Sequence, residues 1–196
     1  MANVNAPRGF RPVRYSDGKP YMGAVNKYYK SASVILGVGD PVVRTTGSTD
    51  PQAIGASVTR ATVGSYVTGH IVAFDAIPAS LSQVGYMLAA DTGYVYVADE
   101  LDMVLEVQEG GSGTALTAAN IGQSINAITA VNANTTIGTS LFQIDNATVT
   151  TASTGTYVIV GLVQRADNVL GQYAKWLVKV NLSTEDGSGA SSVLAI

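Results

Sequence analysis

Hydrophobic and polar residues alternate with a period of two at several places in the chain, most clearly in residues 86–109. This stretch contains three strand-length pieces joined by polar turns at residues 91–93 and 99–102. In the third piece, hydrophobic side chains fall on one face, while Glu106 and Gln108 fall on the other. Because successive side chains of a strand point to opposite faces, the pattern predicts an antiparallel strand with one face in solvent.

Two stretches nearer the C-terminal end also predict strands. Residues 173–182 alternate, with Trp176 and Val178 facing inward and Lys175 facing outward. Residues 157–164 are hydrophobic on both faces, which is typical of a strand inside a sheet.

The remaining elements are predicted from shorter runs between turns. We expect short strands at residues 33–36 and 41–45, a pair formed by residues 56–63 and 66–74, and a hairpin formed by residues 140–144 and 147–151. Ile121, Ile125 and Ile128 have the spacing of one helical face, but Gly122 and many Thr and Asn residues oppose a helix. Residues 116–131 therefore predict a short helix or an irregular loop.

Short strands with frequent turns predict an all-β fold, an antiparallel β-sandwich or barrel with a jelly roll as one option. We expect at most one short helix. Residues 1–30 contain Pro and Gly throughout and lack a regular period, so we expect an extended N-terminal arm. The predicted organisation is an arm of residues 1–30 followed by a single β domain of residues 31–196.

Charge is distributed unevenly along the 196 residues, of which 13% are charged and 46% hydrophobic. Residues 1–30 hold six of the eleven basic residues and one acid, whereas the remainder carries an excess of acids. A basic arm of this kind can lie on its own body, reach a neighbouring subunit, or bind nucleic acid. Since the body is acidic and would repel phosphate, we expect no nucleic-acid partner.

The chain lacks the residue sets that most catalytic and metal sites require. It has no cysteine, and its single histidine, His70, has no predicted nucleophile beside it, so we expect a structural role. The acids of residues 99–109 lack calcium-loop spacing and are interpreted as a solvated turn and strand face. We therefore expect no catalytic residues, metal, cofactor or small-molecule substrate, and no enzyme activity.

Membrane partners are not expected either. No stretch reaches the length of about 18 apolar residues that suggests a membrane helix. The start of the chain has no apolar region of the kind found in signal peptides.

Three stretches together resemble a family of tailed-bacteriophage virion proteins. Residues 1–14, MANVNAPRGFRPVR, resemble that family's start, although Arg8 stands where Phe is frequent. Residues 157–181 resemble a segment of the pattern IVGL..RPDN..G.YA..LVKIN, with Ala166 in place of the common Pro, and residues 116–122 resemble a shared LT..d.G element. The likeness spans nearly the whole chain.

The resemblance implies a capsid decoration or cement protein, which braces major capsid subunits on the outer surface of the head. The implied partners are the major capsid protein and further copies of the chain, with a trimer favoured over a dimer. The implied location is the virion capsid surface after assembly in the host cytoplasm. The residues expected to contact the partner are aromatic and basic residues of the arm: Arg8, Phe10, Arg11, Arg14, Tyr15, Tyr21, Tyr28 and Tyr29.

Two other functions stay open. A tail protein or other virion component would fit the same resemblance. A carbohydrate-binding β-sandwich is a reading from a different class, in which Tyr side chains and Trp176 would be exposed.

Overall fold

The computed structural model of the chain describes residues 3–31, 33–77, 81, 83, 85–128 and 132–185. These residues form strands and loops, and their helical structure consists of two three-residue 3-10 turns, Ala118–Asn120 and Asn146–Thr148. The prediction of an all-β fold with antiparallel sheets and a barrel is confirmed.

One half of the molecule is a six-stranded sheet. Its strand order is β1 (Arg11–Tyr15), β9 (Met103–Gly110), β13 (Lys175–Val180), β12 (Tyr157–Leu162) and β10 (Ser124–Ile125), and β11 (Ile144–Asp145) pairs in parallel with β9. Trp176 and Val178 of β13 are fully buried, so the predicted inward face of this strand is confirmed. The prediction that residues 157–164 form an interior strand is also confirmed, because β12 lies between β13 and β10.

The other half is a closed five-stranded barrel. Its strands follow the order β2 (Asn26–Lys30), β5 (Ser57–Arg60), β4 (Pro41–Arg44), β6 (Gly69–Phe74) and β8 (Gly93–Ala98), and β8 closes onto β2. A small sheet of β3 (Leu36–Gly37) and β7 (Tyr86–Met87) lies beside it. The β-branched and aromatic side chains of these strands fill a second hydrophobic core that includes Tyr28, Val42, Ile71 and Val95.

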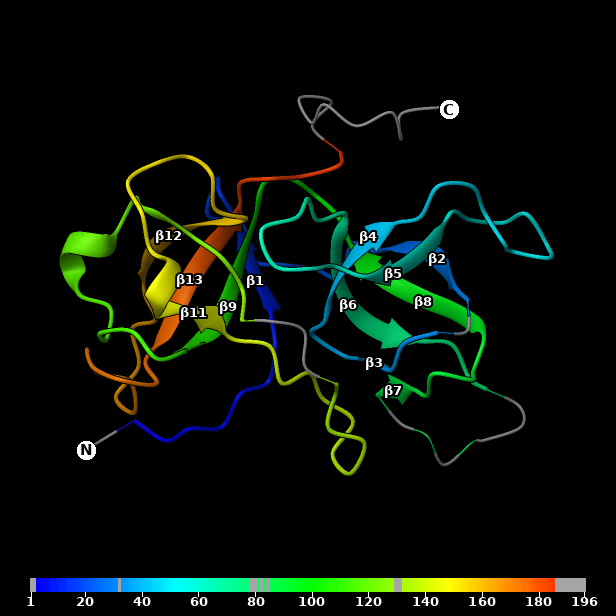
Figure 1. The fold of residues 1–196 in the computed structure, drawn as a ribbon, viewed down its shortest axis with the longest axis horizontal. Coiled ribbons are helices and arrows are strands. Elements are labelled where there is room, and N and C mark those ends of the chain that lie inside the picture. Colours follow the sequence, from blue (N-terminus) through cyan, green and yellow to red (C-terminus); the bar gives the residue numbers. More distant parts are fainter. Residues whose placement is uncertain are drawn as a thin grey trace.

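The barrel and the six-stranded sheet lie side by side along the long axis of the molecule (Figure 1). The turn at residues 99–102 joins them, because β8 belongs to the barrel and β9 to the sheet. The three pieces of residues 86–109 are therefore strands, as predicted, that belong to three different sheets. The prediction of a solvated face on β9 is wrong, since Glu106 is its only residue that is not buried.

Several predicted pairings are also wrong. Residues 56–63 and 66–74 do not pair, because β4 lies between β5 and β6 in the barrel. Residues 140–151 do not form a hairpin, because Ile144 is buried in the parallel pair with β9 and the next residues form a 3-10 turn. Ile125 is buried and Ile121 is exposed, so the isoleucines of residues 116–131 do not form one helical face; residues 129–131 lie outside the described residues.

An aromatic cluster connects the two halves. Phe10, which directly precedes β1, stacks on Tyr157 of β12 with ring centroids 4.4 Å apart and lies 4.9 Å from the ring of His70 on β6. His70 Nε2 and the Tyr157 hydroxyl are hydrogen-bonded at 2.9 Å. Full burial of such a ring contributes about 1.5–3 kcal/mol. His70 is thus part of the buried contact between barrel and sheet.

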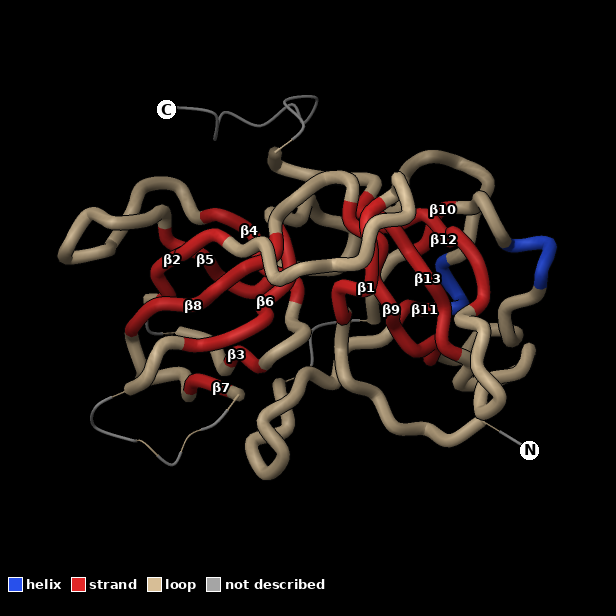
Figure 2. The backbone as a smooth tube through the Cα atoms, turned by 180° about the vertical axis from the view of Figure 1, so that it is seen from behind, coloured by secondary structure: helices blue, strands red, loops and turns tan. Residues whose placement is uncertain are grey.

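The described part of the predicted arm contributes one strand to each half. β1 pairs with β9 in the sheet, and β2 pairs with β5 and β8 in the barrel. Between them the chain crosses from the sheet to the barrel, as seen from the opposite side in Figure 2. The division into an arm of residues 1–30 and a domain of residues 31–196 stays a prediction.

Candidate partner-binding surface

The first described residues lie along the six-stranded sheet. The Gln108 side chain on β9 accepts a hydrogen bond from the Ala6 N–H at 3.1 Å and donates one to the Val4 carbonyl at 3.3 Å. Asn3 donates to the carbonyls of Val169 and Gln172 at 2.8 and 3.1 Å. The contacts of Val4 and Ala6 help to explain why Gln108 is buried.

The eight residues predicted to contact a partner divide into three groups in the structure. Phe10, Tyr28 and Tyr29 are buried within the chain, with exposed fractions of 1%, 3% and 9%. Their rings are therefore not offered to a partner in this conformation. Arg8 and Arg11 are exposed, whereas Arg14, Tyr15 and Tyr21 are half-buried.

Internal contacts account for the position of Tyr28 in particular. Its hydroxyl donates to Asp99 Oδ2 at 2.6 Å and accepts from the Arg44 guanidinium at 2.9 Å. Burial, together with the Asp99 carboxylate, raises the pKa of Tyr28 well above its usual value. Tyr28 therefore stays a neutral donor that joins β2 to the turn between β8 and β9.

The half-buried group lies along and just after β1. The rings of Tyr15 and Tyr21 are 6.3 Å apart, and the Tyr21 hydroxyl donates to the Ala24 carbonyl at 3.0 Å. Arg14 donates to the Tyr15 carbonyl at 3.3 Å. None of these three residues lines the groove that Arg8 and Arg11 share.

Arg8 and Arg11 instead line a groove of about 360 Å³ on the six-stranded sheet. Hereafter "basic groove" denotes the space that these two residues share with Glu106, Gln108, Arg165, Asp167 and Lys175. Arg11 reaches it from β1, directly opposite Glu106 on β9, and Lys175 reaches it from β13, opposite Gln108. A second pocket of about 180 Å³ continues along residues 3–6 and shares Ala6, Asp167 and Lys175 with the first.

The charges of the basic groove are not balanced. Arg165 binds Glu106 with two hydrogen bonds of 2.9 and 3.2 Å and also pairs with Asp167 at 3.5 Å. Arg165 thereby engages both acids of the groove. Arg8, Arg11 and Lys175 form no ion pair with any residue in the described part of the chain. Three cations thus remain available to an external anion.

Sequence reasoning missed part of this groove. Arg8 and Arg11 were expected at a partner contact, but Arg165 and Lys175 lie more than 150 residues away in the sequence. The alternation along β13 predicts that Lys175 faces outward. It does not predict that Lys175 lies near Arg8.

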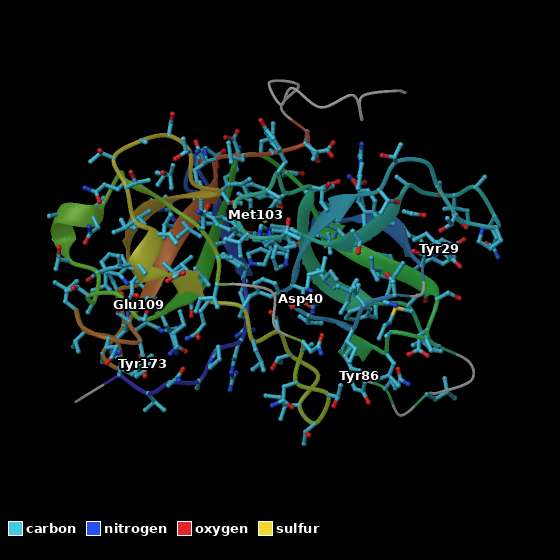
Figure 3. All side chains as sticks on the ribbon, in the orientation of Figure 1. Tyr29, Asp40, Tyr86, Met103, Glu109 and Tyr173 are labelled. Carbon is cyan, nitrogen blue, oxygen red and sulfur yellow. The ribbon has the colours of Figure 1, made fainter. Side chains whose placement is uncertain are left out.

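A buried carboxyl group lies on the opposite side of β9, facing the core. Glu109 is fully buried, and its Oε2 accepts hydrogen bonds from Trp176 Nε1 at 2.8 Å and from the Leu116 N–H at 3.2 Å. Its Oε1 has no partner, and burial raises the pKa of this carboxyl group. Figure 3 shows Glu109 within the six-stranded sheet. The prediction that Glu109 belongs to a solvated acidic face is wrong. Along the strand, Glu109 lies on the same face as Leu105 and Val107, which point inward.

The described residues contain no cluster of three or more His, Cys, Asp or Glu side chains arranged to hold a metal ion. Within the same part of the chain, no helix has the length and hydrophobicity needed to cross a membrane.

Comparison with known proteins gives no relative for this chain: no family model, no curated protein and no solved structure matches it.

Proposed function

We propose that this chain is a structural protein of a tailed-bacteriophage virion, which decorates the outer surface of the head and braces neighbouring major capsid subunits. The six-stranded sheet and the segment of residues 3–9 make the capsid contact in this proposal. The chain acts as a homo-oligomer, with a trimer ahead of a dimer. No catalytic step is involved.

The observation that carries the proposal is the spatial arrangement of the three stretches that resemble the phage family. Residues 3–14 hydrogen-bond to the loop that precedes β13 and pair with β9, which in turn pairs with β13. Residues 116–122, which contain the 3-10 turn Ala118–Asn120, join the same sheet, since the Gly122 N–H donates to the Ile159 carbonyl at 2.8 Å. The resembling residues thus make up one continuous part of the molecule, as expected for stretches that share a function.

The basic groove gives further support, because its unpaired cations can meet acidic residues of a capsid subunit. Charged patches on one partner that meet opposite charges on the other accelerate association and select the correct partner. Arg8, Arg11 and Lys175 provide such a face.

Cryo-electron microscopy of virions from the phage that encodes the chain tests the proposal. Density for the sheet and barrel at regular positions between capsomers is the expected result. Density confined to the tail would favour the tail-protein alternative instead, and virions without density for this chain would refute both. Deletion of residues 2–30 is unsuitable as a test, because it removes β1 and β2 and would unfold both halves.

The structure argues against Trp176 as a sugar-binding residue in the carbohydrate-binding alternative. Trp176 is fully buried and donates its ring N–H to Glu109, so it offers no surface on which a sugar could stack.

A further inference from the structure

Apart from the Val4 carbonyl and the Ala6 N–H, which the Gln108 side chain binds, the main-chain groups of residues 3–9 are not paired with another strand. None of these residues forms a backbone–backbone hydrogen bond within the described part of the chain, and the Gln108 side chain makes the contacts that a neighbouring strand would otherwise make. Unpaired N–H and C=O groups beside a sheet are the usual anchor for an added strand from another protein.

The unpaired main-chain groups and the free cations lie next to each other. The basic groove and its continuation share Ala6, Asp167 and Lys175, so together they follow the segment from Asn3 to Arg8. Residues of this segment line the groove together with Arg165 and Lys175. The groove is thus elongated, open to solvent and cationic, which suits an extended chain better than a compact ligand.

We propose that the basic groove binds an extended acidic segment of the partner protein, whose carboxylates pair with Arg8, Arg11 and Lys175 while its main chain pairs with residues 3–8. The inference deepens the proposed function and rests on it only for the identity of the partner as a capsid subunit. Arginine favours this role because its planar guanidinium binds a carboxylate with two parallel hydrogen bonds.

Binding of a fluorescein-labelled hexaglutamate peptide, followed by fluorescence anisotropy at low salt, tests the groove directly. We expect Arg8→Gln, Arg11→Gln and Lys175→Gln each to weaken binding by about threefold, as for exposed ion pairs, and the triple variant to weaken it by at least about tenfold. Affinity should also fall as salt screens the charges.

Lys19→Gln is the matched control. Lys19 is an exposed cation of the same N-terminal region, but it pairs with Asp17 at 2.7 Å and does not line the groove. This variant should bind hexaglutamate as the unchanged protein does. Equal losses in Lys19→Gln and in the groove variants would show binding by overall charge and overturn the proposal.

Two further probes separate the main-chain contact from charge alone. A hexaglutamate peptide with all backbone amides N-methylated should bind several-fold more weakly, because it has no backbone N–H to donate to residues 3–8. Single-stranded DNA should compete poorly; DNA binding tighter than hexaglutamate, or no peptide binding at all, would refute the acidic-segment assignment.

The peptide assay and the virion assay can fail independently. Peptide binding that depends on the three cations, in a chain absent from virions, would retain the groove and refute the capsid role. Normal decoration of capsids by the triple variant would retain the capsid role and refute the groove as its contact.

Discussion

Asp40 and His70 are buried where the barrel meets the six-stranded sheet, and they should respond to acid in opposite directions. Figure 3 shows Asp40 between the two halves. Its Oδ2 accepts from the Gly37 N–H at 2.9 Å, its Oδ1 has no partner, and burial raises its pKa to about 6. Burial among Phe10 and Tyr157 lowers the pKa of His70 to about 3.

The sign of each contribution follows from which state binds more protons. His70 has a folded pKa below its ordinary value of 6.5, so the unfolded chain binds the proton first and the folded state loses stability as the pH falls below about 6.5. Asp40 has a folded pKa above its ordinary value of 3.8, so the folded state binds the proton first and gains stability as the pH falls through 6.

Between pH 7 and pH 5, the His70 pKa values correspond to a loss of about 2 kcal/mol in the free energy of unfolding. The Asp40 values correspond to a gain of about 1 kcal/mol over the same interval. In the unchanged protein the two contributions largely cancel. Asp40→Asn removes the gain and leaves the acid loss of His70; His70→Gln removes the loss and leaves the acid gain of Asp40.

Urea unfolding at pH 7 and pH 5 measures the effect. The change in unfolding free energy between the two pH values should be more negative for Asp40→Asn than for His70→Gln, by about 3 kcal/mol. All other titrating groups are common to both variants, so they cancel in this difference. A loss of stability that a substitution causes equally at both pH values does not affect the test, because the comparison uses only the pH dependence. Equal pH dependence in the two variants would refute the assigned burial of these groups.

Three further predictions concern buried or constrained residues, and thermal or urea unfolding measures each. Glu109→Ala should lower stability by about 1–3 kcal/mol, since it leaves the Trp176 N–H unpaired, and Glu109→Gln should cost less, because its amide oxygen can still accept from that donor; equal losses in the two variants would contradict this hydrogen-bonding role. Gly9→Ala should destabilise the chain more than Gly18→Ala, because both glycines have positive φ but only a Cβ at Gly9 would overlap other atoms; equal losses would contradict the close approach at Gly9. Lys30→Met should cost at least about 2 kcal/mol, because its buried ammonium group donates to three backbone carbonyls that methionine leaves unpaired; a neutral substitution would refute this role.

The alternation of side chains along one strand was enough to predict much of the local structure. β13, β9 and β8 were all expected as strands, and the inward side chains of β13 were identified correctly, because strand periodicity is a property of consecutive residues. The all-β fold class followed from the same pattern together with the turn residues.

Which strands pair was not contained in that pattern. β8 and β9 follow each other across a four-residue turn but belong to different halves, and β4 separates β5 from β6. A hydrophobic strand face specifies that it must be covered and does not specify by what. The N-terminal segment contacts Gln108 from more than a hundred residues away in the sequence, so a side chain expected in solvent is buried.

The same division applies to the candidate site. The basic character of the N-terminal region, including Arg8 and Arg11, could be predicted from the sequence, because charge and composition are additive along the chain. Folding buries Phe10, Tyr28 and Tyr29 in the chain's own cores. It also places Lys175 beside Arg8 and Arg11, while Arg165 engages the neighbouring acids. Burial and charge pairing depend on which distant segments meet, and this is fixed by packing of the whole chain.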